Sequence, residues 1–122
     1  MNRKRILIIS DDTRLVGFLH DHLSVRDYQI ASTGNGGEEL REILDSELPD
    51  LVILDIIMPW MDGIELCLRI RQWCPVPVLM LSTWGAIKGT VRGLDLGNES
   101  YLTEPFDVNG LMTRVESALY RN

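Results

Sequence analysis

The sequence predicts an α/β fold in which helices cover both faces of a parallel sheet. Short, continuously apolar runs occupy residues 6–9, 51–54 and 77–81, and such runs are typical of strands buried on both faces. Segments with apolar residues at helical spacing alternate with these runs along the whole chain. This alternation favours a doubly wound parallel sheet with right-handed crossovers.

Capping and breaking residues mark the ends of the elements. Ser10, Asp11 and Asp12 end the first strand and offer capping oxygens to the next helix. A glycine-rich turn at 34–37 follows the second strand, and Pro49 ends the second helix. We expect strands at 6–9, 28–32, 51–54, 77–81 and 101–103, and helices at about 15–24, 40–48, 64–73, 87–96 and 111–119.

These elements predict a flavodoxin-like α/β fold, with five parallel strands in the order 2-1-3-4-5 and five helices. A loop containing Pro59 and Asp62 is expected between the third strand and the third helix. The 122 residues have the usual size of one domain, and no linker or repeat interrupts them. We therefore treat residues 1–122 as a single domain.

Composition limits the classes of function. The formal net charge of −6 disfavours direct binding to nucleic acid or to an anionic membrane. No apolar run approaches the roughly 20 residues of a membrane helix, so we expect a cytoplasmic protein. Cys67 and Cys74 have no His or acidic partner at metal spacing and are interpreted as reduced core thiols.

Polar residues directly follow the apolar strands, at 11–12, 55, 82–83 and 103–104. In this fold the carboxyl ends of the central strands form the functional crevice. Asp11 and Asp55 would converge there, and a hard cation such as Mg²⁺ would relieve their repulsion. Asp55 could then attack a phosphoryl donor, with Ser82 donating a hydrogen bond to the bound group. The alternative for Asp11 or Asp12 taken alone is a helix cap or turn former.

Three segments resemble the receiver domain of bacterial two-component response regulators. Residues 51–63 read Leu-Val-Ile-Leu-Asp-Ile-Ile-Met-Pro-Trp-Met-Asp-Gly, similar to the phosphoacceptor strand and loop of that family. Residues 91–97 and 101–106 resemble later segments of it, in the right order and spacing. The resemblance covers essentially the whole chain and is nearest to the regulators that carry a winged-helix DNA-binding output domain.

The resemblance implies roles for individual residues. Asp55 would be the phosphoacceptor, phosphorylated by a sensor histidine kinase in a Mg²⁺-dependent reaction. Asp11 and the backbone carbonyl of Ile57 would join Asp55 as metal ligands. Ser82 would be the switch hydroxyl, and Tyr101 the aromatic side chain that changes orientation on activation. An output domain or partner protein would receive the signal.

Several positions depart from the family pattern around the reacting centre. Ser10 stands where the family has the first of two acids, and Asp12 then caps the helix more readily than it reaches the metal. Glu104 replaces the family's phosphate-pairing lysine, and like charges 4–6 Å apart repel by a few kcal/mol at an effective dielectric near ~20. Thr83 replaces a very small residue and narrows access to Asp55.

Bulky side chains also stand where water would approach. Ile57 and Trp84 lie two residues after Asp55 and Ser82. Apolar side chains at these two positions would exclude water and slow hydrolysis of an acyl phosphate. Simple surface packing explains the presence of Ile57 and of Trp84 equally well.

These residues leave three functions open. The first is a phosphorylatable receiver, at most a Mg²⁺-dependent self-phosphorylating and autodephosphorylating protein rather than a conventional enzyme. The second is an atypical receiver in which Ser10 and Glu104 have weakened or abolished phosphorylation, leaving a dimerisation or protein-binding module. The third, a phosphatase or nucleotide-binding enzyme, lacks both a second acid at position 57 and a phosphate-binding glycine loop.

A homodimer is a further expectation from the resemblance. The family often dimerises through its fourth helix, fifth strand and fifth helix. Charged residues of both signs fall on that face, although a mixed helix face is more often simply solvated. They are Arg92, Asp95, Glu99, Arg114 and Glu116.

Overall fold

A five-stranded parallel sheet forms the centre of the molecule. The computed structural model describes residues 3–34, 38–55, 57–58, 61–82, 100–103 and 107–120. The strand order is β2-β1-β3-β6-β7, and every neighbouring pair is parallel. This order confirms the predicted 2-1-3-4-5 arrangement. The strands are β1 (Lys4–Ile9), β2 (Tyr28–Thr33), β3 (Leu51–Asp55), β6 (Val78–Ser82) and β7 (Ser100–Thr103).

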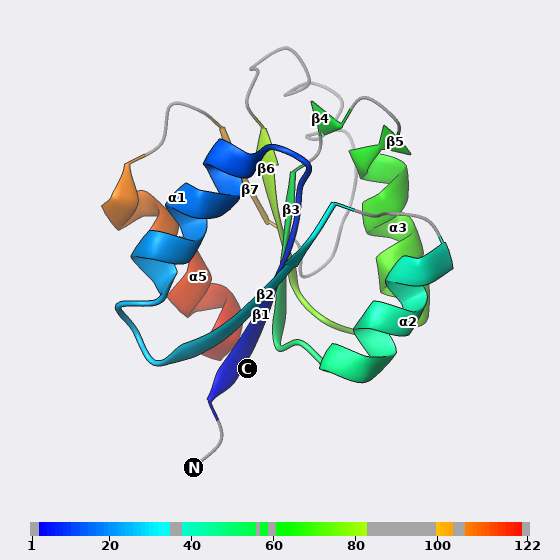
Figure 1. The fold of residues 1–122 in the computed structure, drawn as a ribbon, viewed down its shortest axis with the longest axis horizontal. Helices are drawn as coiled ribbons and strands as arrows, with labels where there is room; N and C mark the ends of the chain where they lie inside the picture. Colours follow the sequence, from blue (N-terminus) through cyan, green and yellow to red (C-terminus); the bar gives the residue numbers. More distant parts are fainter. Residues whose placement is uncertain are drawn as a thin grey trace.

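Helices cover the sheet on both sides. In Figure 1, α1 and α5 lie on one side of the sheet, and α2 and α3 lie on the other. In the part of the chain that the structure describes, the helices are α1 (Thr13–Leu23), α2 (Glu38–Glu47), α3 (Gly63–Trp73) and α5 (Val108–Tyr120). The helix predicted at 87–96 and part of the turn at 34–37 lie outside the described residues.

The core consists of two layers, one on each face of the sheet. Successive residues of a strand point to opposite faces, so Ile53 packs with the α1 and α5 side chains while Val52 and Leu54 pack with α2 and α3. All five residues of β3 are buried. Fully burying an aliphatic side chain stabilises a fold by about 1.5–3 kcal/mol. The central strand is therefore a firm support for the residue at its end.

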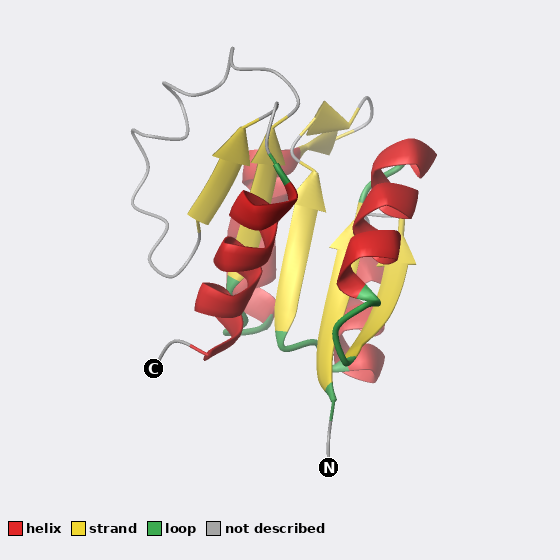
Figure 2. Cartoon of the chain, turned by 90° about the vertical axis from the view of Figure 1, so that its left-hand side faces the viewer, coloured by secondary structure: helices red, strands yellow, loops and turns green. Residues whose placement is uncertain are grey.

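One element after β3 is not predicted from the sequence. The segment expected to be a plain loop contains a small antiparallel hairpin, with β4 (Ile57–Met58) paired to β5 (Met61–Asp62). Two-residue arms are too short to show an alternating pattern, which explains the omission. Figure 2 places this hairpin at the end of the sheet where the β3 and β6 arrowheads point.

Two reciprocal hydrogen bonds fix the start of β3 against β1. The backbone N–H of Asp50 donates to the Arg5 carbonyl oxygen at 2.7 Å, and the Arg5 N–H donates to the Asp50 carboxylate at 2.8 Å. From this point the β1–β3 register runs through Ile9 opposite Leu54. The register therefore sets which residues meet at the far end of the two strands.

Candidate functional site

Asp55 ends the central strand as a buried carboxylate. It is the last residue of β3, and its residue exposure is only 3%. Its Cα partner on β6 is Leu81, which precedes Ser82. The third strand thus ends where the sequence predicts. An acid this deeply buried needs hydrogen-bonding partners or a nearby charge.

Ser10 supplies one of these partners. Ile9 pairs with Leu54, so the residues that follow them, Ser10 and Asp55, lie beside each other. The Ser10 hydroxyl donates to Oδ2 of Asp55 at 2.9 Å, and Ser10 itself is 5% exposed. From the sequence, Ser10 is expected to end the first strand, to offer a capping oxygen and to stand in place of an acid, and its bond to Asp55 is not predicted. The register of the two neighbouring strands is the signal that could have found it.

Asp11 and Asp12 have different surroundings. Asp11 is exposed and follows Ser10 at the same edge of the sheet. Asp12 is the N-cap of α1, where its Oδ1 accepts hydrogen bonds from the N–H groups of Arg14 at 3.0 Å and Leu15 at 3.3 Å. This bears out the expectation that Asp12 caps the helix.

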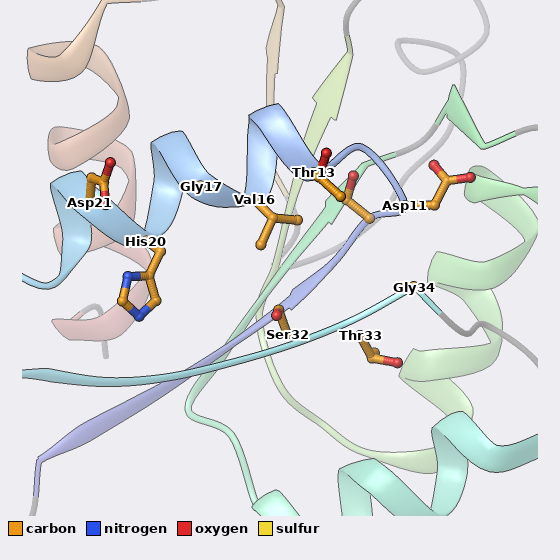
Figure 3. A pocket seen from close by; sticks show the side chains of 10 residues that line it. Asp11, Thr13, Val16, Gly17, His20, Asp21, Ser32, Thr33 and Gly34 are labelled. Carbon is orange, nitrogen blue, oxygen red and sulfur yellow. The ribbon is translucent and has the colours of Figure 1, made fainter.

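A pocket lies beside the site, between α1 and β2. Its volume is about 540 Å³. It shares Ser10 and Asp11 with the site and extends along α1 toward His20 and Asp21. Figure 3 shows the Asp11 carboxylate at the end of this pocket away from His20. The pocket follows α1 and is not lined by Asp55.

The backbone brings other predicted residues to the same edge. Ser82 is the last residue of β6, one position beyond the partner of Asp55, and it pairs with Thr103 of β7. Tyr101 pairs with Met80 on the neighbouring strand, and Ile57 begins the hairpin after β3. Three further site residues lie outside the described residues: Thr83, Trp84 and Glu104.

The oxygen ligands at this edge suit a hard cation. The described residues contain no group of three or more His, Cys, Asp or Glu side chains that could hold a metal. Mg²⁺, however, commonly takes one or two carboxylates and completes its shell with water and substrate oxygens. Asp11 follows β1 and Asp55 ends the neighbouring β3, so this edge of the sheet carries two carboxylates of the kind that Mg²⁺ accepts as ligands.

Glu116, which belongs to the predicted dimer face, forms an ion pair within the chain. Glu116 of α5 accepts a hydrogen bond from Arg26, in the turn after α1, at 2.8 Å. Arg92, Asp95 and Glu99 lie outside the described residues. Within the described ranges, no helix is long and apolar enough to span a membrane.

A doubly wound sheet with a buried acid at the end of its central strand, and a second acid just after the neighbouring strand, places the chain among the α/β domains that carry functional residues at the carboxyl ends of their strands. The family model described as response regulator receiver domain matches residues 6–116. The chain belongs to this family, and it is a receiver domain of two-component signal transduction. Receiver domains generally bind Mg²⁺ for phosphorylation, and they interact with histidine kinases and output domains.

Similar proteins include transcriptional regulators about twice as long. The chain is 37% identical over 122 residues to the DNA-binding dual master transcriptional regulator RpaA of Synechocystis, covering 96% of this chain and 49% of that protein. It is 35% identical over 120 residues to the alkaline phosphatase synthesis transcriptional regulatory protein PhoP of Bacillus subtilis, covering 98% and 50%. The chain thus spans about half the length of the curated relatives it matches.

A solved structure extends the likeness to the fold. A two-component response regulator from Clostridium difficile aligns with a TM-score of 0.84 at 28% identity, covering 98% of each chain. The similarity thus includes the order of the strands as well as the sequence.

Proposed function

We propose that this receiver accepts a phosphoryl group on Asp55 from a sensor histidine kinase and thereby switches an output domain or partner. The observation that carries the proposal is the buried Asp55 carboxylate at the end of β3, with Asp11 at the same edge of the sheet. A carboxylate held at a strand end is available for in-line attack on a phosphorus atom.

The chemistry needs no proton transfer from the protein. A carboxylate oxygen of Asp55 attacks phosphorus, the bond from phosphorus to the donor breaks, and the bonding electron pair leaves with the donor. Asp11, Asp55 and the Ile57 carbonyl would hold Mg²⁺, which offsets the negative charge that develops on the transferring group. Ser82 and Thr83 would donate hydrogen bonds to the phosphoryl oxygens, and Tyr101 would report the change to the surface.

The output is proposed from the relatives. RpaA and PhoP are named as transcriptional regulators, and this chain covers about half of each. We therefore propose that the signal reaches a DNA-binding output domain, with contacts between two copies through α5, β7 and the segment before β7. Cys67 and Cys74 are not joined in a disulfide, which is compatible with a reducing, cytoplasmic compartment.

The test is phosphorylation by acetyl phosphate in the presence of Mg²⁺. Intact-protein mass spectrometry should show the addition of one phosphoryl group, and Asp55→Asn and removal of Mg²⁺ with EDTA should each abolish it. Restoring a cation with Glu104→Lys should increase the labelling, because a positive charge attracts the phosphoryl group. No mass gain in the wild-type protein, or equal labelling of Asp55→Asn, would contradict the proposal.

A further inference from the structure

The Ser10 hydroxyl has a fixed direction. Its oxygen accepts a hydrogen bond from the backbone N–H of Asp12 at 3.0 Å, while its own N–H donates to the Thr33 carbonyl oxygen at 3.0 Å. A hydroxyl has a single proton to donate. The 2.9 Å bond to Asp55 uses that proton, so Ser10 is held at three points and directs its donor at Oδ2.

The bond also changes the charge at this edge of the sheet. An acid at position 10 would add a second carboxylate next to the buried Asp55, and the two would repel each other unless a cation lay between them. Ser10 instead presents a neutral donor to the carboxylate. A hydrogen bond to a charged acceptor is stronger than one between neutral groups, so Asp55 is held by the protein itself.

We propose that Ser10 is a positioning residue for phosphoryl transfer, and that its hydroxyl fixes the orientation of Asp55 without the help of a divalent ion. This inference rests on the proposed function of Asp55. In the reaction a carboxylate oxygen of Asp55 attacks phosphorus; the bond from phosphorus to the acetate oxygen of acetyl phosphate breaks, and acetate leaves with the electron pair. The other carboxylate oxygen becomes the carbonyl oxygen of the acyl phosphate.

Three substitutions at this position separate positioning from metal binding. Ser10→Ala removes the donor, Ser10→Thr keeps it, and Ser10→Asp replaces it with a charge. Ser46→Ala, on the exposed surface of α2, is the matched control. For each protein, labelling by acetyl phosphate is measured against Mg²⁺ concentration, and the dissociation constant of Mg²⁺ alone is measured by calorimetry. Thermal unfolding checks that each variant is folded, and Ser10→Asn supplies an alternative donor if the threonine methyl group is not accommodated.

The expected pattern has two parts. Ser10→Ala should lower the maximal labelling rate about tenfold, the size expected for one hydrogen bond to a charged group. The dissociation constant of Mg²⁺ should change by less than about twofold, because the hydroxyl is not a metal ligand. Ser10→Thr or Ser10→Asn should restore most of the rate. Ser10→Asp should tighten Mg²⁺ binding by about tenfold, because a third carboxylate adds to the cation's field.

The results that overturn the inference are distinct from those that overturn the proposed function. A Ser10→Ala protein labelled as fast as the wild type and the Ser46→Ala control would overturn the positioning role alone. A loss of rate that neither Ser10→Thr nor Ser10→Asn restores would also overturn it, because the donor would then be irrelevant. A wild-type protein that is not labelled on Asp55 would overturn both.

Discussion

Neutralising Asp55 should make the metal-free protein more stable. Asp55 is a carboxylate with a residue exposure of 3%, and removing a charge from water destabilises the native state unless its partners compensate in full. In Asp55→Asn the side-chain carbonyl can still accept the hydrogen bond from Ser10. The change therefore removes the charge and keeps this hydrogen bond, and the free energy of unfolding should rise by about 1–3 kcal/mol.

The effect on the melting temperature follows from the size of the chain. Unfolding entropy is about 2.1 cal/mol/K per residue near ~60 °C, so for 122 residues each kcal/mol shifts the midpoint by about 4 °C. In EDTA, Asp55→Asn should unfold about 4–12 °C above the wild type. Mg²⁺ at about ten times its dissociation constant should stabilise the wild type by about 1.4 kcal/mol, or about 6 °C, and the variant much less.

The assay is thermal unfolding followed by circular dichroism, in EDTA and across a Mg²⁺ series. Asp45→Asn, on the exposed surface of α2, is the control for a change of net charge. An Asp55→Asn protein that melts at or below the wild-type temperature in EDTA, with an undiminished response to Mg²⁺, would refute the reasoning about the buried charge.

Three further predictions concern the supporting structure. In denaturant titrations, Asp12→Ala should lower the free energy of unfolding by about 1 kcal/mol because α1 loses its N-cap. Asp12→Ser should restore the stability, and an Asp12→Ala protein as stable as the wild type would contradict the capping role. Leu48 has a φ of 48° and is 68% exposed. In thermal unfolding, Leu48→Gly should therefore raise the free energy of unfolding by up to about 1 kcal/mol, because glycine adopts the left-handed conformation without strain. A lower free energy of unfolding would show that the Leu48 side chain contributes packing contacts. Burial raises the pKa of Tyr28 above its ordinary 10.0, with Tyr120 and Glu116 adding to the shift and Arg26 opposing it. The folded protein thus disfavours the tyrosinate form of Tyr28, so its stability is retained below pH 10.0 and falls as pH rises toward the higher folded-state pKa. Tyr28→Phe should weaken this fall of the melting temperature at alkaline pH. An unchanged fall would exclude Tyr28 as its source.

Much of the fold could be predicted because burial leaves a strong pattern in the sequence. Strands covered on both faces need continuous apolar runs, and the β3 run at 51–54 predicts both the strand and the acid that ends it. The hairpin of β4 and β5 could not be predicted in the same way. Its arms pair through backbone groups over only two residues each, and side-chain periodicity does not record such short pairings.

The site was predictable in its residues and less so in its contacts. Asp55 and Asp11 are identified by residue type at the end of an apolar run, whereas the bond from Ser10 depends on the register between two segments 45 residues apart. That register is set partly by Arg5 and Asp50 at the opposite end of the strands. Residue type alone does not contain this information, because a shift of one residue would bring different side chains together.

Both ends of β3 are fixed by hydrogen bonds to the segment that contains β1 and the residue after it, Ser10. At its start, Asp50 and Arg5 exchange two hydrogen bonds; at its end, Asp55 accepts from Ser10. The four residues between, 51–54, are buried by helices on both faces, and close-packed interiors of this kind resist small displacements. The acid at the end of β3 is thus supported by its strand and by the neutral hydroxyl of Ser10. Under the proposed function, a divalent ion at this edge would not be needed to orient the carboxylate, and its charge would serve to offset that of the phosphoryl group.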